Sequence, residues 1–335
     1  MYQPPPPAEA PVSLLLSGFG PVGRCFVELS RAKQHQGLLN VAAIRGHTSE
    51  IHLPPSSDVP DRRLWGPLLA PEESLRKSRA TILVQAIPSS PEAHQRAVDE
   101  AVTALNNGID VVTATKSHLI THWAELQAAA TSGGSRIRIS GATGAALPTA
   151  DLARVALTGL DCEAIRACPN GTSTFVLDQI SQGNTLEEAM IEAQRRGIAE
   201  SETKSDLSGA DSATKVRLIA GLLWGWDVTR INVETEAIDR RTAAKIEAAA
   251  RQGGRLRAVA TASTDQPMLV TVKLEQVEPV DPLFHITGPE KAMVFRCPSA
   301  GDITVQGGRS SPSGAALAML KDVLNLFNSN PTGFR

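Results

Sequence analysis

The sequence predicts an α/β protein, with a doubly wound parallel sheet in its first half and a second, α+β domain in its second half. Three observations lead to this prediction. A glycine-rich turn at residues 18–23 joins an apolar run to a helical pattern near the N-terminus. Short apolar runs then alternate with helical patterns as far as residue 140, as in a parallel sheet with crossover helices. Beyond residue 250, strand-like runs follow one another directly, which is typical of antiparallel pairing.

Length and composition limit the class of protein. The chain has 335 residues, of which 42% are hydrophobic and 20% charged, as in soluble proteins of about two domains. A net charge of −2 gives no general attraction to nucleic acid or to an anionic membrane, and 4% aromatic residues argue against base stacking. No apolar run reaches the ~20 residues of a transmembrane helix. We therefore expect no nucleic-acid or membrane partner.

The N-terminus and the cysteines indicate where the protein is located. Residues 1–11 are rich in proline and lack the basic and apolar regions of a signal peptide, so we expect a disordered tail. The four cysteines form no CxxC pair and no framework at short spacing, which is typical of a reducing compartment. We expect a cytoplasmic protein.

The glycine-rich turn follows a short apolar run at 12–17 that is typical of a buried parallel strand, and a helical pattern follows it. This is a G-x-G-x-x-G motif between strand and helix. Gly18 permits the tight turn, Gly20 lets the backbone approach a pyrophosphate, and Gly23 allows close packing of helix on strand. The helix N-terminus offers free N–H groups to the phosphates. The motif predicts a Rossmann-type dinucleotide-binding domain. The predicted cofactor contacts of the turn are Gly18, Phe19, Gly20, Pro21, Val22 and Gly23.

The second predicted strand, at 39–44, ends at Arg45. In folds of this type an acidic residue at that position holds the ribose hydroxyl of NAD, whereas a cation accommodates the 2′-phosphate of NADP. Arg45, with the hydroxyl groups that follow it, therefore favours NADP. An arginine that only faces solvent is the alternative, and NAD stays open.

The rest of the first half continues the alternation. Residues 50–78 are rich in proline, serine and charge, and predict a long loop with one short helix at most. A strand at 80–87, a helix at about 91–106 and a strand at 110–114 follow. Lys116 comes just after this last strand, where open α/β sheets bind ligands. Taken alone, it is more simply a surface lysine.

Two loops of the second half carry groups suited to a small ligand. Residues 141–148, after a strand at 136–140, are small enough for their backbone to contact a ligand or an ion. The Asn-Gly-Thr turn at 170–172 offers N–H groups and a hydroxyl to an anion. The simpler interpretation of that turn is a cap for a helix that begins near Phe175.

The most unusual stretch runs from residue 200 to residue 215. It holds four carboxylates within twelve residues and then enters a helical pattern. Asp211 and Lys215 are four residues apart, so they lie on one helical face, a turn apart. A solvated loop with a surface ion pair, worth only ~0.3–0.5 kcal/mol, is the plain alternative. The four carboxylates are Glu200, Glu202, Asp206 and Asp211.

The remaining elements complete the second domain. Thr185 and Glu188 form a capping box that opens a helix ending before Gly197. We expect the dinucleotide-binding domain at 12–140 and a catalytic and dimerisation domain at 141–313, with a C-terminal helix at 314–328 that packs back on the first domain. Further helices are predicted to Trp224 and at 241–251, and strands at 162–168, 256–262, 268–275, 291–297 and 301–306.

Taken together, these segments resemble the homoserine dehydrogenase family. The matching pieces span nearly the whole chain, and their order and spacing are far more specific than any one piece. They are GFGPVG (18–23), VVTATK (111–116), GATGAALP (141–148), NGTSTFVLDQI (170–180), IAESE (198–202), DLSGADSATK (206–215) and DPLFHITG (281–288). The resemblance implies hydride transfer with NAD(P)H between L-aspartate 4-semialdehyde and L-homoserine, in the biosynthesis of threonine and methionine. It also leads us to expect a short form without a C-terminal ACT domain, and a homodimer formed through the second half.

The resemblance assigns roles residue by residue. Lys116 and Lys215 match the catalytic lysines, and Asp211 matches the aspartate paired with the second lysine; Lys116 is also expected at the cofactor. A cationic lysine near the aldehyde oxygen can stabilise negative charge and deliver a proton. Carboxylates suit the ammonium group of an amino acid. The residues implied to bind the amino-acid head of the substrate are Gly171, Thr172, Glu200 and Asp206.

The loop at 141–148 departs from the family's pattern. A glutamate that helps to bind sodium or a similar ion usually begins this loop, and Ser140 stands at its position. Backbone carbonyls near Thr143 and Ala145 can still hold a monovalent cation, which stays among the predictions. Ala145 and Ala146 also replace a glycine pair.

These departures leave two alternatives open. The first is a paralogue that carries out the same hydride transfer on a related amino alcohol or hydroxy acid, which Ser140 and the altered loop favour. The second is a nucleotide-sensing or scaffold protein that kept the fold without activity. Retention of Lys116, Asp211 and Lys215 argues against that second alternative.

Overall fold

The structure is a computed structural model, and it describes residues 11–32, 35, 37–199, 204–308 and 310–327. The predicted tail at 1–11 lies outside these residues except for its last one, and Glu200 and Glu202 lie outside them too. None of the helices in the described part combines the length and the apolar character needed to cross a bilayer.

The chain divides into two compact units. The first holds the described residues up to Thr113, residues 125–138 and the described residues from Met319 onwards; the second holds 114–124 and the described residues of 139–318. The predicted division at 140/141 thus falls at 138/139, and 114–124, including Lys116, belongs to the second unit. The last helix, α12 (Pro312–Phe327), has its C-terminal part in the first unit. There Arg136 donates a hydrogen bond to the Leu326 carbonyl.

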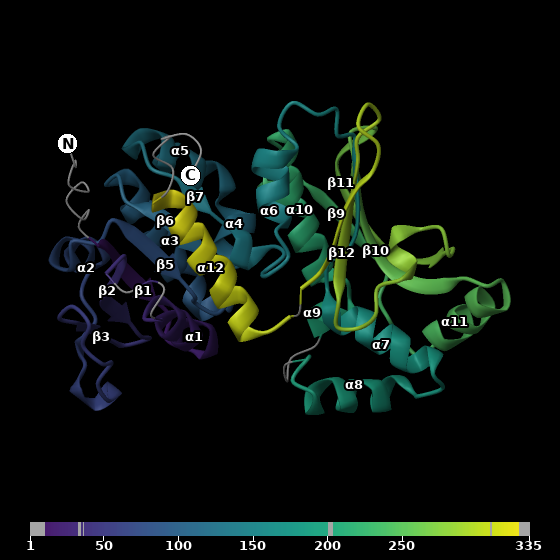
Figure 1. The fold of residues 1–335 in the computed structure, drawn as a ribbon, viewed down its shortest axis with the longest axis horizontal. Coiled ribbons are helices and arrows are strands. Elements are labelled where there is room, and N and C mark those ends of the chain that lie inside the picture. The colour runs from purple at the N-terminus through teal and green to yellow at the C-terminus, as the bar shows by residue number, and fades with distance from the viewer. Residues whose placement is uncertain (1–10, 33–34, 36, 200–203, 309, 328–335) are drawn as a thin grey trace, which may run out of the picture. The chain divides into compact units, whose positions relative to one another are not determined.

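The first unit contains a seven-stranded sheet in the order β4-β3-β2-β1-β5-β6-β7. Figure 1 labels its strands except β4. The five strands from β2 to β7 in this order pair in parallel, which confirms the predicted fold class, and two antiparallel strands extend the β2 edge. The strands are β1 (Val12–Ser17), β2 (Leu39–Arg45), β3 (Ser49–His52), β4 (Gly66–Pro67), β5 (Ile82–Gln85), β6 (Asp110–Thr113) and β7 (Ile137–Arg138). The main helices are α1 (Pro21–Ser30), α2 (Pro71–Ser78), α3 (Pro91–Asn106) and α5 (Trp123–Gly133).

The stretch at 50–78 is more regular than predicted, because it contains β3, a short 3-10 helix η2 (Arg62–Leu64), β4 and α2. Helix α2 begins with Pro71, carries acidic residues in its first turn and basic residues in its last, and so matches the helix dipole. Its buried face consists of Leu75 and two serines. With a single apolar residue on that face, the sequence shows no helical period of hydrophobic residues.

The second unit contains a six-stranded sheet in the order β13-β12-β8-β10-β11-β9. Strands β10 and β11 pair antiparallel, as predicted. Strand β9, which was not predicted, pairs in parallel with β11, and all four of its residues are exposed, so it lacks an apolar pattern. The strands are β8 (Ala164–Cys168), β9 (Asn232–Thr235), β10 (Arg255–Ser263), β11 (Gln266–Val277), β12 (Lys291–Arg296) and β13 (Ile303–Gly307).

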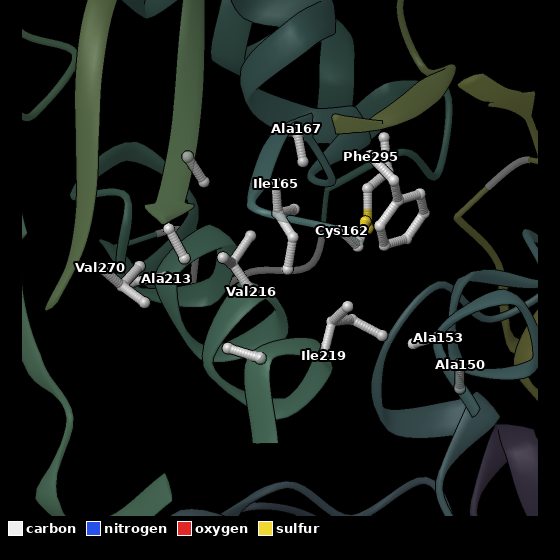
Figure 2. Close-up of a cluster of buried hydrophobic side chains, with 14 of the residues drawn as sticks. Ala150, Ala153, Cys162, Ile165, Ala167, Ala213, Val216, Ile219, Val270 and Phe295 are labelled. Carbon is white, nitrogen blue, oxygen red and sulfur yellow. The ribbon is translucent and has the colours of Figure 1, made fainter. Parts of the chain in front are cut away.

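Helix α10 (Ala210–Trp224) is fixed against one face of this second sheet. Its residues Ala213, Val216 and Ile219 follow a helical period and are at most 1% exposed. Figure 2 shows them facing Ile165 of β8 and Phe295 of β12. This packing holds the first two turns of α10, where Asp211 and Lys215 lie, in a fixed place.

Helix α7 (Gly171–Ser181) begins four residues earlier than predicted. Asn170 is its N-cap, and the Asn170 side chain accepts a hydrogen bond from the backbone N–H of Ser173. The prediction placed the helix start at Phe175 because the residues before it are small and polar; in the structure they are buried in the first turn. The capping box of Thr185 and Glu188 is confirmed at α8 (Leu186–Arg195).

Candidate active site

One carboxylate in the second unit joins two lysines. Asp211 Oδ1 lies 2.7 Å from Lys116 Nζ, and Asp211 Oδ2 lies 2.6 Å from Lys215 Nζ. Lys116 directly precedes the short helix α4 (Ser117–Thr121), while Asp211 and Lys215 lie on successive turns of α10. Lys215 also donates to the carbonyl of Pro169 at 3.0 Å. The three residues predicted to be catalytic therefore form one cluster.

Asp211 stays anionic in this cluster. Burial of the carboxyl group acts to raise its pKa, but the charges of Lys215 and Lys116 outweigh that effect and hold the Asp211 pKa well below its usual range. The side chains differ in access, since Lys116 is 33% exposed and Lys215 is 13% exposed. The cluster thus offers one ammonium group to solvent or a ligand and holds the other more deeply.

Asn170 links the cluster to Asp206, the carboxylate predicted to bind the substrate. Its Nδ2 donates to Asp211 Oδ2 at 2.8 Å and to Asp206 Oδ1 at 2.6 Å. Asn170 was not among the predicted site residues, although its position as a helix cap could have indicated it. A capping asparagine uses its oxygen for the helix and keeps its two N–H donors for other partners.

Asp206 lies in the short helix α9 (Lys204–Leu207), where its carboxyl group is largely buried. Burial raises the pKa of this carboxyl group, the hydrogen bond from Asn170 lowers it, and the negative charge of Asp211 raises it again, with a net upward shift. The charges of Lys215 and Lys116 lower the Asp206 pKa but do not cancel this shift, so the buried carboxylate is suited to a further ammonium group from outside the protein. This is the property that a binding site for an amino acid needs.

Two other residues predicted to bind the substrate, Gly171 and Thr172, begin helix α7. The remaining one, Glu200, lies outside the described residues. Gly171 is required by a close approach, because a Cβ there would lie 2.4 Å from the Pro289 carbonyl oxygen. The Thr172 hydroxyl is buried and donates to the Ile198 carbonyl at 3.2 Å. Its lone pairs leave it able to accept a hydrogen bond from a ligand.

In the first unit, the glycine-rich turn has the shape that a dinucleotide needs. A Cβ on Gly18 would lie 2.3 Å from the Ala86 carbonyl oxygen, and one on Gly23 would lie 2.1 Å from the Gly18 carbonyl oxygen, so both positions require glycine. A Cβ on Gly20 would meet nothing within 4 Å. Helix α1 starts at this open position without a side-chain cap. These residues fit the pyrophosphate of NAD(P).

Comparison with known proteins decides the family. The family model described as homoserine dehydrogenase matches residues 148–324, which is more than half of the chain. The chain belongs to the homoserine dehydrogenase family. The predicted enzyme class, an NAD(P)-dependent enzyme like homoserine dehydrogenase, is confirmed at that level.

Individual homoserine dehydrogenases resemble the chain over almost its full length. That of Sulfurisphaera tokodaii is 29% identical over 94% of this chain and 98% of its own. The crystal structure of a putative homoserine dehydrogenase from Archaeoglobus fulgidus has a TM-score of 0.81 and 25% identity, covering 94% of this chain and 99% of the other. A hyperthermophilic archaeal homoserine dehydrogenase mutant in complex with NADPH shares the fold, with a TM-score of 0.79 and 24% identity, covering 96% and 99% of the two chains.

Arg45 does not support the predicted contact with a 2′-phosphate. Its guanidinium group is buried, and it pairs with Glu50 at 2.7 Å and with Glu100 at 2.9 Å. It also donates to the Leu69 carbonyl at 3.0 Å and to the hydroxyl of Ser74. The side chain turns into the first unit because buried carboxylates on β3 and α3 draw it there, so it has little capacity left for a cofactor.

Two other arginines of this chain, Arg24 and Arg62, lie beside its glycine-rich turn. The guanidinium carbon of Arg24 is 4.7 Å from the centre of the Phe19 ring, and that of Arg62 is 5.8 Å from it. Arg62 also donates to the Phe19 carbonyl at 2.7 Å. Both arginines are exposed and line a pocket of about 530 Å³. Neither arginine was predicted, because nothing in the sequence of the loop predicted at 50–78 places Arg62 near residue 19.

The loop at 140–148, where the family resemblance implied a cation, uses several of its polar groups internally. The Ser140 carbonyl accepts from the backbone N–H of Ala145 at 3.0 Å and from the Thr143 hydroxyl at 3.2 Å. The Gly144 carbonyl accepts from Lys291 Nζ at 2.7 Å. An ammonium group thus stands at the loop, and the residues present do not fit a metal ion there. In the described part of the chain, no three His, Cys, Asp or Glu side chains are grouped to hold a metal.

Proposed function

We propose that the protein interconverts L-aspartate 4-semialdehyde and L-homoserine by hydride transfer with NAD(P)H. The observation that carries the proposal is the placement of Asp211 between Lys116 and Lys215, with Asn170 joining it to Asp206. This arrangement combines two cations for an aldehyde oxygen with a carboxylate for an ammonium group. Membership of the homoserine dehydrogenase family supports the same substrate pair. The reaction would serve the biosynthesis of threonine and methionine.

The two lysines and Asp211 have different roles in the proposed reaction, which follow from their charges. When bound, the cofactor supplies the hydride that reduces the aldehyde carbon and accepts it in the reverse direction. A lysine ammonium group of the cluster stabilises the negative charge that develops on the aldehyde oxygen and gives that oxygen a proton. Lys116 is the more exposed of the two, so it can exchange its proton with solvent more readily. Asp211 holds both lysines near each other in spite of their repulsion.

The substrate is held at its other end by Asp206. Its carboxylate accepts hydrogen bonds from the substrate ammonium group, and Asn170 orients the carboxylate. We assign Gly171, Thr172 and Glu200 to the same amino-acid head, with the first two at the start of α7. The start of that helix carries a partial positive charge suited to the substrate carboxylate.

For the cofactor, we propose NADP, with NAD as the alternative. The open position at Gly20 and the start of α1 would hold the pyrophosphate. Because Arg45 is engaged in buried ion pairs, we assign the contact with the 2′-phosphate to Arg62 or Arg24 instead. Initial rates of homoserine oxidation with NADP⁺ and with NAD⁺, measured in parallel, test this assignment.

A second candidate function is favoured by the loop at 140–148. Ser140 and the alanine pair at 145–146 replace family residues, and Lys291 reaches the loop from β12. These changes suit a paralogue that acts on a related amino alcohol or hydroxy acid. Turnover with a panel of amino alcohols, but not with homoserine, would establish the paralogue and reject the first proposal.

We also propose a homodimer formed through the second unit. The edge strand β9 has four exposed residues, and such an edge can pair with another chain. Light scattering coupled to size-exclusion chromatography tests this proposal. A mass that stays at 35.4 kDa at all concentrations would reject it.

A further inference from the structure

Lys291 is an unusual residue that the proposed reaction does not use. It begins β12 and is only 1% exposed, although lysine is almost never fully buried without a charged partner. Within the described part of the chain it makes no ion pair with a carboxylate. Its hydrogen bond is to a backbone oxygen, the Gly144 carbonyl, at 2.7 Å. The ammonium group therefore needs an explanation other than a salt bridge.

The loop around Gly144 is folded tightly onto itself. A Cβ on Gly144 would lie 2.1 Å from the Leu147 carbonyl oxygen and 2.6 Å from the Thr149 hydroxyl oxygen. Ala145 has a φ of +52°, a left-handed conformation that L residues seldom adopt. The Thr149 hydroxyl is buried and has no hydrogen-bond partner among the described residues. The loop thus gathers oxygen atoms at a buried position, as backbone sites for monovalent cations do.

The ammonium group of Lys291 is also close enough to the catalytic cluster to interact with it. Burial and the charge of Lys215 lower the Lys291 pKa and the charge of Asp211 raises it, with a net decrease to about 7. Lys291 belongs to the same unit as both of these residues. When Lys291 is protonated, its positive charge at the loop therefore contributes to the electrostatics of the Asp211–Lys215 pair.

We propose that the Lys291 ammonium group takes the place of a monovalent metal ion at the loop of residues 140–148. An ammonium group carries the same single charge as Na⁺ or K⁺ and reaches carbonyl oxygens at a similar distance. The Lys291 ammonium group and a metal ion cannot occupy the loop together, because the two buried positive charges would repel each other and no additional carboxylate is present among the described residues to balance them. Ser140, which has no negative charge, agrees with a loop that does not need to attract a free ion.

The wild-type protein provides the first test, and this test needs no substrate. Its thermal unfolding is measured at pH 6.5, where Lys291 is mainly protonated, in chloride salts of Na⁺, K⁺ and the bulky cation N-methylglucamine at equal ionic strength. We expect the same midpoint temperature in all three salts. A higher midpoint in Na⁺ or K⁺ would show a bound metal ion and would overturn the proposal.

The second test removes the Lys291 ammonium group by mutation and supplies a small cation from solution. Lys291→Ala leaves space at the loop, and Lys273→Ala removes an exposed lysine from the same sheet as a matched control. We expect the unfolding midpoint of Lys291→Ala, but not that of the control, to rise when Na⁺, K⁺ or methylammonium replaces N-methylglucamine. Broadening of the ²³Na resonance by Lys291→Ala alone would report the same binding.

Activity provides a separate measurement. In N-methylglucamine chloride, Lys291→Ala should lose about tenfold or more in kcat, with partial recovery in K⁺ or methylammonium. Full wild-type activity of Lys291→Ala without a small cation would overturn the proposal. If this variant does not fold, the comparison of salts on the wild-type protein still decides. Because the unfolding and ²³Na measurements need no turnover, they stay valid even if homoserine is not the substrate.

Discussion

Lys116 and Asp211 stand 95 residues apart in the chain, and the structure joins them through an ion pair of 2.7 Å between Lys116 Nζ and Asp211 Oδ1. The second oxygen of the same carboxylate meets Lys215 at 2.6 Å. One carboxylate therefore holds two cations that would otherwise repel each other. A change at Asp211 disturbs both lysines together, which a change at either lysine alone does not.

The variant Asp211→Asn should lose most of the activity. An amide cannot balance two ammonium groups, so the two lysines repel each other and move apart. We expect kcat to fall roughly 100-fold or more and the free energy of unfolding to fall by about 1–3 kcal/mol. Steady-state kinetics and urea unfolding measure these two quantities. Asp239→Asn, which breaks an exposed pair with Arg241, is the control that should change neither. Wild-type kcat in Asp211→Asn would contradict the role given to this carboxylate.

Asp206→Asn should separate substrate binding from stability. The folded protein raises the pKa of Asp206, so between the unfolded value near ~3.9 and the raised folded value it binds more protons than the unfolded chain. The contribution of Asp206 to stability therefore falls as the pH rises through that interval, and the ionised carboxylate destabilises the fold above it. We expect Asp206→Asn to raise the unfolding temperature at pH 7 and to raise KM for homoserine more than it lowers kcat.

The pH dependence provides the control for this prediction. The stability difference between Asp206→Asn and wild type should shrink as the pH falls below the unfolded pKa, because both side chains are then neutral. Unfolding curves at a series of pH values measure it. A destabilised Asp206→Asn at pH 7 with an unchanged KM would show that the carboxylate serves the fold and not the substrate.

The two functions of Asn170 can be tested separately. Asn170→Ser keeps an oxygen that can cap α7, but it loses the amide group that joins Asp206 to Asp211. Asn170→Ala loses both. We expect both variants to lose activity, but only Asn170→Ala to lose about 1 kcal/mol of stability through the missing cap. Full activity in Asn170→Ser would show that the amide bridge is not needed for turnover.

Arg45 and Arg62 should have opposite effects. Arg45→Met breaks two buried ion pairs, so the free energy of unfolding should fall by about 3–5 kcal/mol while the ratio of rates with NADP⁺ and NAD⁺ stays the same. Arg62→Ala, in contrast, should raise KM for NADP⁺ and leave the unfolding temperature nearly unchanged. Arg63→Ala is its control, because this neighbour is 89% exposed and pairs with Asp61. A cofactor preference that changes only in Arg45→Met would restore the contact first predicted for that residue.

The local parts of this site could be predicted from the sequence. The spacing of Asp211 and Lys215 places them on one helical face, and the packing of α10 keeps them there. Likewise, the order of glycines at 18–23 determines a turn that tolerates no side chain at Gly18 and Gly23. In both cases the information lies within one turn of chain, where spacing and backbone sterics decide the geometry.

The remaining parts depend on residues that only the fold brings together. Arg45 lies at the strand end where a cofactor cation was predicted, but Glu50 and Glu100 determine which way its guanidinium group points. Lys291 begins an apolar strand, and nothing near it in the sequence indicates that its amine reaches Gly144, 147 residues away. For such side chains, the direction depends on partners that no local pattern identifies.

The central claim is that Lys215, held by Asp211, takes part in hydride transfer between L-homoserine and L-aspartate 4-semialdehyde. The most direct measurement is the initial rate of NADPH formation from homoserine and NADP⁺ by wild type and by Lys215→Ala, with cofactor affinity measured by fluorescence titration. We predict a homoserine-dependent rate in wild type that falls about 100-fold or more in Lys215→Ala at unchanged cofactor affinity. A Lys215→Ala rate near that of wild type, or no rate with homoserine in wild type, would contradict the claim.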